Sequence, residues 1–414
     1  MGWGLVAASR AKLLDNCTLG DDKGKLDATI VDMCSEARRV TGGPRPRSAA
    51  SVANAVCTSL WKRTNHLLVV FYDNHARMHA QRSVLWSKRY RRLTDDECRA
   101  AEAKGKVVID GAAYAPSSLP YTPEEVALMR TNASVVWPRL WCTQHGKKKA
   151  FSLISAAMVE WHHKNYVDGS GRRFVSWHAD TPLSYPYNDA DARDVARRCC
   201  SNTFGEADSM VSEALKVIGP DMTVNVQTID TDMILQIVAS RTAHTWRPSR
   251  LRLLNETINV ADLVRQFGND DYPRRLTSAF WLLACNGVDY CKGLTRFGFN
   301  TAALLQLASK PTKPLFVLCD AHAAFESDTF LSLLAATKRR RVKNRDWGDF
   351  HSEVSAILFC ISLFSGALCQ RVPCGGPDLV ECAVSTTEGA TPFDDASLAA
   401  AKACAQVPSI VLGA

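Results

Sequence analysis

Two short apolar segments of the chain each end in an aspartate. Residues 28–32 (ATIVD) are almost continuously apolar and end in Asp32. Residues 66–73 (HLLVVFYD) are also almost continuously apolar and end in Asp73. Such runs are typical of strands buried on both faces of a parallel sheet, because helices cover both sides of it. The pattern therefore predicts an α/β fold whose central, mainly parallel sheet is flanked by helices.

A third strand is predicted over residues 222–229, and the acidic pair Asp230 and Asp232 follows it. Residues two apart on a strand share a face, so we expect these carboxylates to point together off its carboxyl end. Open α/β sheets bind ligands at that edge.

The segment before this strand predicts a helix over residues 207–218, with Glu206 and Asp208 in its first turn. The exposed N–H groups of a helix start favour negative charge. Together with Asp230 and Asp232, four acids fall within 27 positions. They would repel one another without a cation, so their convergence would imply a bound metal. The alternative is a capped helix followed by a polar turn.

Residues 77–92 carry six basic side chains and no acidic ones, interleaved with Trp86 and Tyr90. Arg82 and Arg89 are seven residues apart, which places them on one face of a helix. A solvated helix face is the ordinary explanation of such a run. A phosphate-binding role is favoured here because the run begins just after Asp73.

Residues 111–200 are expected to be an insertion. Asp168-Gly-Ser-Gly predicts the turn of a hairpin between residues 161–167 and 172–177. Four side chains in the segment are candidate zinc ligands, although their spacing matches no standard zinc finger. These are Cys142, His145, His162 and His163.

Further along the chain, the pattern predicts helices over residues 276–286 and 301–308 with a glycine-bearing turn between them. The turn contains Asp289, Gly293 and Gly298, and its backbone N–H groups are suited to a phosphate. Asp289 is alternatively a simple cap. Residues 315–320 form another apolar run that ends in an acid, which leaves Asp320 as a further candidate. The chain after residue 315 is expected to be a largely helical extension.

The composition of the chain predicts an anionic partner and a reducing environment. The 414 residues are 46% hydrophobic and 22% charged, with a net charge of +8, which favours association with an anionic partner. The fifteen cysteines show no CxxC pair and no signal peptide precedes them, so we expect reduced thiols in an intracellular protein. The longest apolar run, residues 354–369, is too short to span a bilayer comfortably, so no membrane association is expected.

In their order along the chain, these motifs resemble those of the flap-endonuclease superfamily of structure-specific 5′ nucleases, which have a PIN-like fold. The opening Met1-Gly-Trp-Gly-Leu5 is similar to the family's start, and Arg82 with Arg89 to the basic pair on its helical arch. Gly287-Val-Asp289-Tyr-Cys-Lys-Gly293 is similar to the start of its helix-two-turn-helix. The family's seven carboxylate positions are all filled, by Asp32, Asp73, Glu206, Asp208, Asp230, Asp232 and Asp289.

Two positions depart from the family pattern. Ile229 stands where the family has an acid before the Asp-x-Asp pair, and Arg38 stands where it has an aromatic that stacks on DNA. The insert between the two halves of the core is also longer, and the chain contains no recognisable sliding-clamp peptide. These departures bear on the substrate and the replication partners more than on the metal site.

The resemblance implies a nuclease that hydrolyses phosphodiester bonds in flap or junction DNA with two Mg²⁺ or Mn²⁺ ions. One ion would be held by Asp32, Asp73, Glu206 and Asp208, and the other by Asp230, Asp232 and Asp289, some of them through water. Arg82 and Arg89 would contact the scissile phosphate. Further nucleic-acid contacts are expected at Gly2, Arg77, Lys88, Arg91, Arg92, Gly293 and Gly298.

The implied organisation has four segments. Residues 1–110 are the first half of the nuclease core with the arch, 111–200 the insertion, 201–315 the second half with the helix-two-turn-helix, and 316–414 the helical extension. A nuclear or viral replication compartment fits this activity. Two alternatives stay open: an RNA endonuclease resembling viral host-shutoff nucleases, and a catalytically inactive nucleic-acid-binding scaffold.

Overall fold

The computed structural model describes part of the chain. The described residues are 14, 17–19, 24–73, 92–165, 171–178, 181–185, 207, 211, 214–215, 218, 221–230, 232–239, 248–253, 256–286, 293–294, 301–311, 313–319, 322–326, 329–330, 332–333, 353–354, 357–358 and 361. The chain divides into two compact units, which are described separately. Unit 1 comprises Met1–Asp22, His79–Arg82 and Asp230–Ala414, and unit 2 comprises Lys23–Met78 and Ser83–Ile229.

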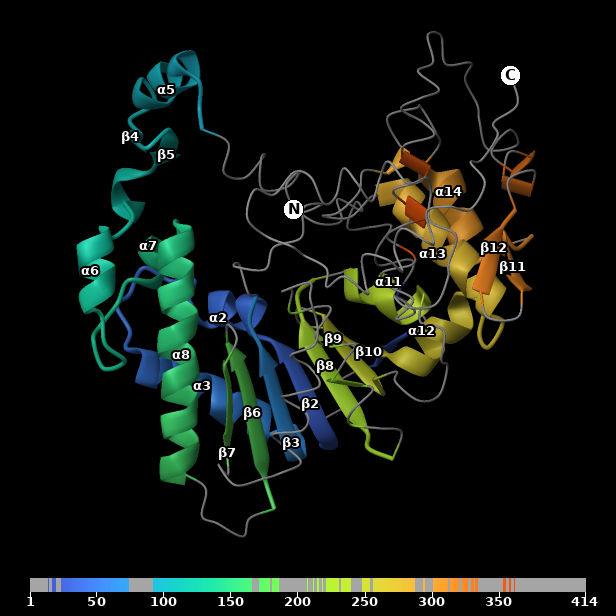
Figure 1. Ribbon diagram of the computed structural model, residues 1–414, viewed down its shortest axis with the longest axis horizontal. Coiled ribbons are helices and arrows are strands. Elements are labelled where there is room, and N and C mark those ends of the chain that lie inside the picture. Colours follow the sequence, from blue (N-terminus) through green and yellow to red (C-terminus); the bar gives the residue numbers. More distant parts are fainter. Residues whose placement is uncertain are drawn as a thin grey trace. The chain divides into compact units, whose positions relative to one another are not determined.

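Unit 2 is built on a mostly parallel sheet, as the apolar runs predict (Figure 1). Its strands lie in the order β8-β2-β3-β6-β7. The first four are parallel to one another, and β7 is antiparallel to β6. Their bounds are β2 Leu26–Asp32, β3 Thr64–Phe71, β6 Arg173–His178, β7 Thr181–Tyr185 and β8 Val224–Thr228. The expected α/β class is therefore confirmed at the level of a mixed fold with a mostly parallel sheet and flanking helices.

One face of this sheet packs against α2 (Met33–Thr41), α3 (Ala49–Trp61) and α8 (Gln144–Asn165). Val31, Val70 and Phe174 on the strands share one buried cluster with apolar side chains of the three helices. The residues that alternate with them, such as Ile30 and Val69, are also fully buried. Burial of both sets explains why the strands are apolar at nearly every position.

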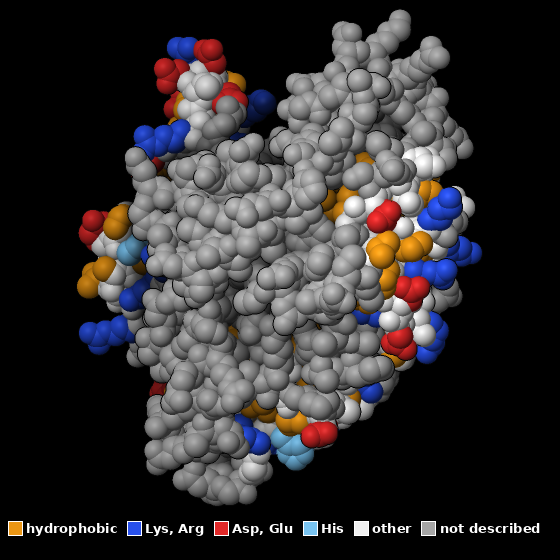
Figure 2. All heavy atoms as spheres, turned by 45° about the vertical axis from the view of Figure 1, so that its right-hand side comes forward, with side chains coloured by type: hydrophobic (Ala, Val, Ile, Leu, Met, Phe, Trp, Pro, Cys, Tyr) orange, Lys and Arg blue, Asp and Glu red, His pale blue; other side chains and the backbone are white. Residues whose placement is uncertain are grey.

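Residues 92–141 form a series of short elements that connect to α8. They are α5 Asp95–Glu102, β4 Val107–Ile109, β5 Ala112–Tyr114, η3 Pro116–Ser118, α6 Pro123–Leu128 and α7 Trp137–Trp141. None of the α5 residues is buried, and Figure 2 shows acidic and basic side chains interspersed over this helix at the upper left. Capping boxes at Thr94 and Thr122 begin α5 and α6, and each satisfies N–H groups of the first turn.

The expectation of a hairpin between residues 161–167 and 172–177 is wrong. The first of these segments belongs to α8, which continues to Asn165, because Trp161 and His162 pack into the core from the helix. The strand after Gly171 instead pairs with β7, with Ser176 opposite Leu183. The segment expected to be an insertion therefore contains α8 and two strands of the central sheet, β6 and β7.

Unit 1 contains an antiparallel three-stranded array and a group of helices. β10 (Glu256–Asn259) pairs with β1 (Thr18–Leu19) on one side and with β9 (Arg250–Leu253) on the other. Its helices include α11 Asp232–Ala239, α12 Val260–Gln266, α13 Tyr272–Asn286 and α14 Thr301–Ser309.

The predicted helices at 276–286 and 301–308 are confirmed as α13 and α14. The expected helical extension begins with a hairpin of β11 (Phe316–Cys319) and β12 (His322–Phe325). Aromatic side chains, among them Phe280, Phe316 and Phe330, join that hairpin to α13. Within the described part of the chain, no helix has both the length and the apolar character needed to cross a membrane.

Candidate functional site

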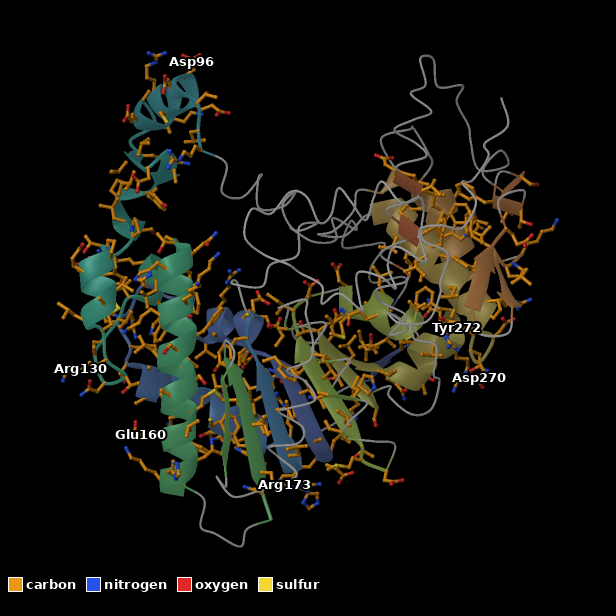
Figure 3. The ribbon with its side chains drawn as sticks, in the orientation of Figure 1. Asp96, Arg130, Glu160, Arg173, Asp270 and Tyr272 are labelled. Atoms are coloured by element: carbon orange, nitrogen blue, oxygen red, sulfur yellow. The ribbon has the colours of Figure 1, made fainter. Side chains whose placement is uncertain are left out.

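The carboxyl ends of β2 and β3 bring two of the predicted acids to one edge of the sheet. Asp32 is the last residue of β2 and pairs in register with Phe71, the last residue of β3. Asp73 comes two positions later. In Figure 3, Arg173 at the first residue of β6 marks the opposite, amino end of these parallel strands. The two acids therefore lie at the carboxyl end of the strands, which is the end of the sheet at which α/β proteins bind ligands.

Asp32 is held in place through both of its carboxylate oxygens. Oδ1 accepts the backbone N–H of Cys34 at 2.9 Å, which makes Asp32 the N-cap of α2. Oδ2 accepts the hydroxyl of Thr228, the last residue of β8, at 3.2 Å. The side chain is nearly buried, with 6% of the residue exposed. Contacts from α2 and β8 thus fix the orientation of this carboxylate.

Asp73 is partly buried, and its Oδ1 accepts the backbone N–H of Ala207 at 3.2 Å. Ala207 is helical and buried, in agreement with the helix predicted over 207–218. It stands between Glu206 and Asp208 in the sequence. Those two acids lie outside the described residues.

The thiol of Cys34 lies beside these acids and was missed by the sequence analysis, which considered Cys34 only as one of fifteen reduced cysteines. The backbone N–H of Asp73 donates to Cys34 Sγ at 3.2 Å. Burial raises the pKa of this thiol well above its ordinary value, and the charges of Asp73 and Asp32 raise it further. We call Asp32, Cys34, Asp73, Ala207 and Thr228 the acidic edge.

The acidic edge has the chemistry that Mg²⁺ or Mn²⁺ requires. Hard divalent ions prefer carboxylate oxygens, and Asp32 and Asp73 supply them from two adjacent strands. The hydrogen bonds described above come from neutral N–H and O–H donors, which orient a carboxylate without themselves cancelling its charge. Among the described residues, no three His, Cys, Asp or Glu side chains already form a complete metal site. Three of the seven predicted ligands, Glu206, Asp208 and Asp289, lie outside that part of the chain.

The geometry expected for Asp230 and Asp232 is wrong. β8 ends at Thr228, and Asp232 is the first residue of α11, so the two acids are not two apart on a strand. Asp230 Oδ1 instead accepts the backbone N–H of Asp232 at 2.9 Å, a local turn that begins the helix. Asp232 is buried, with 2% exposed. Both residues belong to unit 1 and Thr228 to unit 2.

Most of the other predicted nucleic-acid contacts lie outside the described residues. Gly293 is described and buried, and Arg92 is described and exposed. The candidates outside the description are Gly2, Arg77, Arg82, Lys88, Arg89, Arg91, Gly298 and Asp320.

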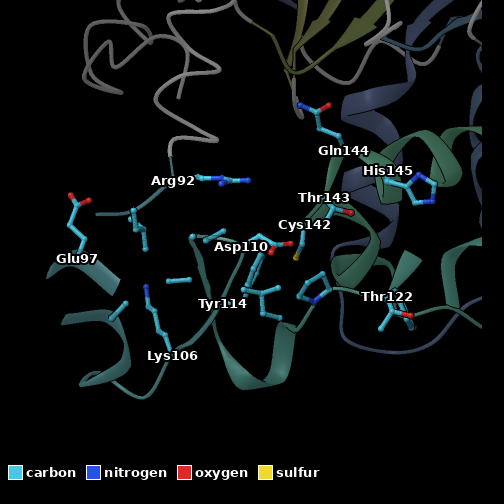
Figure 4. A pocket seen from close by; sticks show the side chains of 18 of the residues that line it. Arg92, Glu97, Lys106, Asp110, Tyr114, Thr122, Cys142, Thr143, Gln144 and His145 are labelled. Carbon is cyan, nitrogen blue, oxygen red and sulfur yellow. The ribbon is translucent and has the colours of Figure 1, made fainter. Parts of the chain in front are cut away.

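Arg92 lines a cavity of about 990 Å³ in unit 2, between the α5, β4 and β5 segment and the junction of α7 with α8 (Figure 4). Its charged lining is mixed, because Glu97 and Asp110 accompany Arg92, Lys104 and Lys106. The lining contains none of the seven predicted carboxylates. This cavity is therefore separate from the acidic edge.

The zinc candidates in residues 142–163 are not brought together. His145 and His162 are 17 residues apart on α8, which at 1.5 Å per residue separates them by about 26 Å. Cys142 Sγ donates to the carbonyl of Pro138 at 3.1 Å. His162 is buried and bonded to Trp61. The length of α8 keeps His145 and His162 too far apart to bind one zinc ion, in agreement with a spacing that matches no standard zinc finger.

Comparison with protein-family models and with curated proteins gives no match for this chain.

Proposed function

We propose that the chain is a metal-dependent nuclease that hydrolyses phosphodiester bonds in flap or junction DNA. The observation that carries the proposal is the acidic edge, where Asp32 and Asp73 follow adjacent parallel strands and are oriented by neighbouring N–H and O–H groups. The order of the sequence motifs supports the same activity.

Asp32 and Asp73, with Glu206 and Asp208 on either side of Ala207, would hold one divalent ion. Asp230, Asp232 and Asp289 would hold a second, as the resemblance implies. When bound, a pair of such ions supplies an activated water nucleophile and stabilises the leaving oxygen. Some of these carboxylates would act through water, because Mg²⁺ keeps several waters and binds few carboxylates directly.

The chain's own cations would contribute at the phosphate. Arg82 and Arg89 would contact the scissile phosphate and stabilise the charge that develops on it. The turn that contains Gly293 and Gly298 would offer backbone N–H groups to a phosphate of the duplex beside the cleavage site. Duplex binding by this turn is the reason for preferring a flap or junction in DNA to a bare single strand of RNA.

A substrate panel tests the proposal. Labelled 5′-flap DNA, nicked duplex, single-stranded DNA and single-stranded RNA are incubated side by side with Mg²⁺ and with a chelator. We expect cleavage of the flap substrate that requires Mg²⁺. Faster cleavage of unstructured RNA than of flap DNA would assign the chain as an RNA endonuclease. Binding without cleavage of any substrate would assign it as an inactive scaffold.

A further inference from the structure

Cys34 joins the ends of two strands that are separated by a long stretch of sequence. Its backbone N–H donates to Asp32 Oδ1 at 2.9 Å, so the position of Cys34 is set by the acid that ends β2. Its sulfur accepts the backbone N–H of Asp73, 39 residues away, at 3.2 Å. Through this one residue, the cap of α2 is connected to the chain that leaves β3.

The thiol lies against Asp73 at two places. Its sulfur accepts the Asp73 backbone N–H, and the thiol stands beside the Asp73 carboxylate, whose charge raises the pKa of the thiol. A thiol offers a weak S–H donor and a weak acceptor, so the S–H is available to this carboxylate while the sulfur accepts the N–H. Asp73 is therefore tied at its backbone to Cys34, whose own backbone N–H is held by Asp32, and the Asp73 carboxylate stands next to the Cys34 thiol.

We propose that Cys34 is a positioning residue, which holds the Asp73 carboxylate in the orientation that binds a divalent cation. The proposal rests on the proposed function, since it concerns the same metal site. Groups that hydrogen-bond to metal ligands fix the orientation of those ligands, and their loss typically lowers metal affinity about 10- to 100-fold.

Cys34 is not assigned as a ligand itself. Mg²⁺ and Mn²⁺ are hard ions that prefer oxygen, whereas a sulfur ligand selects softer ions such as Zn²⁺. The backbone N–H of Asp73 also occupies one side of the sulfur. The thiol acts on the metal through Asp73.

The test measures Mn²⁺ binding to the full chain by calorimetry, so that it does not depend on nuclease activity. The variants are Cys34→Ala, which removes both contacts, and Cys34→Ser, whose hydroxyl keeps a donor and an acceptor. Cys57→Ala is the matched control, because Cys57 is a fully buried free thiol in α3. We expect the Mn²⁺ dissociation constant to rise about tenfold or more in Cys34→Ala, to be largely restored in Cys34→Ser, and to be unchanged in Cys57→Ala.

Three results would overturn the assignment. Unchanged Mn²⁺ affinity in Cys34→Ala, in a chain whose wild type binds Mn²⁺ and cleaves DNA, removes the positioning role and leaves the proposed function intact. A Co²⁺ complex with a thiolate charge-transfer band that Cys34→Ser abolishes would make Cys34 a direct ligand. A wild-type chain that binds no Mn²⁺ would remove the metal site of the proposed function together with this inference.

Discussion

Two groups of described polar side chains in unit 2 lie where helices meet the sheet, one around His162 and the other at the acidic edge. They differ in the kind of hydrogen bond that holds their polar atoms. In the first, His162 Nε2 accepts the Trp61 indole N–H at 2.8 Å, so Nδ1 carries the proton and donates to the Met158 carbonyl at 2.6 Å. The ring also stacks on Phe174 with centroids 3.9 Å apart. Both ring nitrogens are used within the core, which leaves this group no capacity for a ligand.

The acidic edge is arranged differently. A carboxylate has about four lone-pair positions, and the donors described at Asp32 and Asp73 are neutral N–H and O–H groups. These bonds fix the direction of the oxygens and do not themselves neutralise the negative charge. The comparison teaches that a polar group inside a fold indicates function when its bonds orient it without neutralising it. The following predictions test that distinction.

The largest effect is expected at the acidic edge. Asp32→Asn and Asp73→Asn keep the shape of the side chain and an oxygen that accepts the same N–H, but they remove the charge. We expect cleavage of flap DNA to fall about a thousandfold, or roughly 4 kcal/mol of transition-state stabilisation. Binding of the same DNA should stay within several-fold, because phosphate contacts elsewhere persist.

A melting curve in chelator is the control for these variants. Removing one of two neighbouring negative charges relieves repulsion, so neither variant should melt below the wild type without metal. Full cleavage activity in either of them would remove that residue from the metal site.

A smaller loss is expected from the cations proposed to contact the phosphate. Arg82→Ala or Arg89→Ala should slow single-turnover cleavage about a hundredfold, because the contact strengthens as charge develops in the transition state. The dissociation constant for DNA should change less than this rate. If only affinity falls, and its salt dependence falls by about one unit per residue, these arginines are ordinary backbone contacts.

A substitution of His162 should lower the stability of the fold and leave metal binding unchanged. His162→Ala removes two hydrogen bonds and a stacked ring from the core, which should lower the free energy of unfolding by about 2 kcal/mol at pH 7. Mn²⁺ affinity should be unchanged. A loss of Mn²⁺ affinity equal to that of Asp73→Asn would erase the distinction between the two groups.

The pH dependence of this effect has a defined sign. Burial lowers the pKa of His162 to about 4, below its ordinary value of about 6.5. As pH falls through this window, the unfolded chain takes up a proton that the folded chain does not, so the wild type loses stability. The stability difference between wild type and His162→Ala should therefore be largest at neutral pH and shrink toward pH 4. Denaturant melts at a series of pH values measure it.

The smallest effect is expected at Thr228. Thr228→Val keeps a β-branched side chain for the end of β8 but removes the hydroxyl that donates to Asp32 Oδ2. We expect about a tenfold loss of Mn²⁺ affinity. Thr228→Ser retains the hydroxyl and serves as the matched control. Equal affinity in both variants would show that the hydrogen bond from the Cys34 backbone N–H is sufficient to orient Asp32.

The sequence predicted the elements whose burial is uniform. β2, β3 and β8 were found because the residues on both faces of these strands are buried and almost every position of β2 and β3 is apolar. β7 was missed because Pro182 interrupts it, although proline is tolerated in a strand at the edge of a sheet. The end of α8 was assigned to a strand because Asp168-Gly-Ser-Gly predicted the turn of a hairpin, whereas Trp161 and His162 bond to side chains of α3 from the helix.

Part of the candidate site was predicted because it follows directly from the buried strands. Asp32 and Asp73 follow from strand ends, which a pattern can locate. The contacts of Cys34 with Asp73 and of Ala207 with Asp73 join residues 39 and 134 positions apart, and no local pattern contains such pairs. Asp230 and Asp232 were placed on one strand face because the pattern did not show that α11 begins at Asp232.

The most direct test of the account is Mn²⁺ binding by the full chain, compared with the double variant Asp32→Asn/Asp73→Asn. If the acidic edge holds a divalent cation, calorimetry will show binding to the wild type that the double variant loses, while both chains melt cooperatively in chelator. Equal Mn²⁺ binding by the two chains would contradict the claim that Asp32 and Asp73 form a metal site.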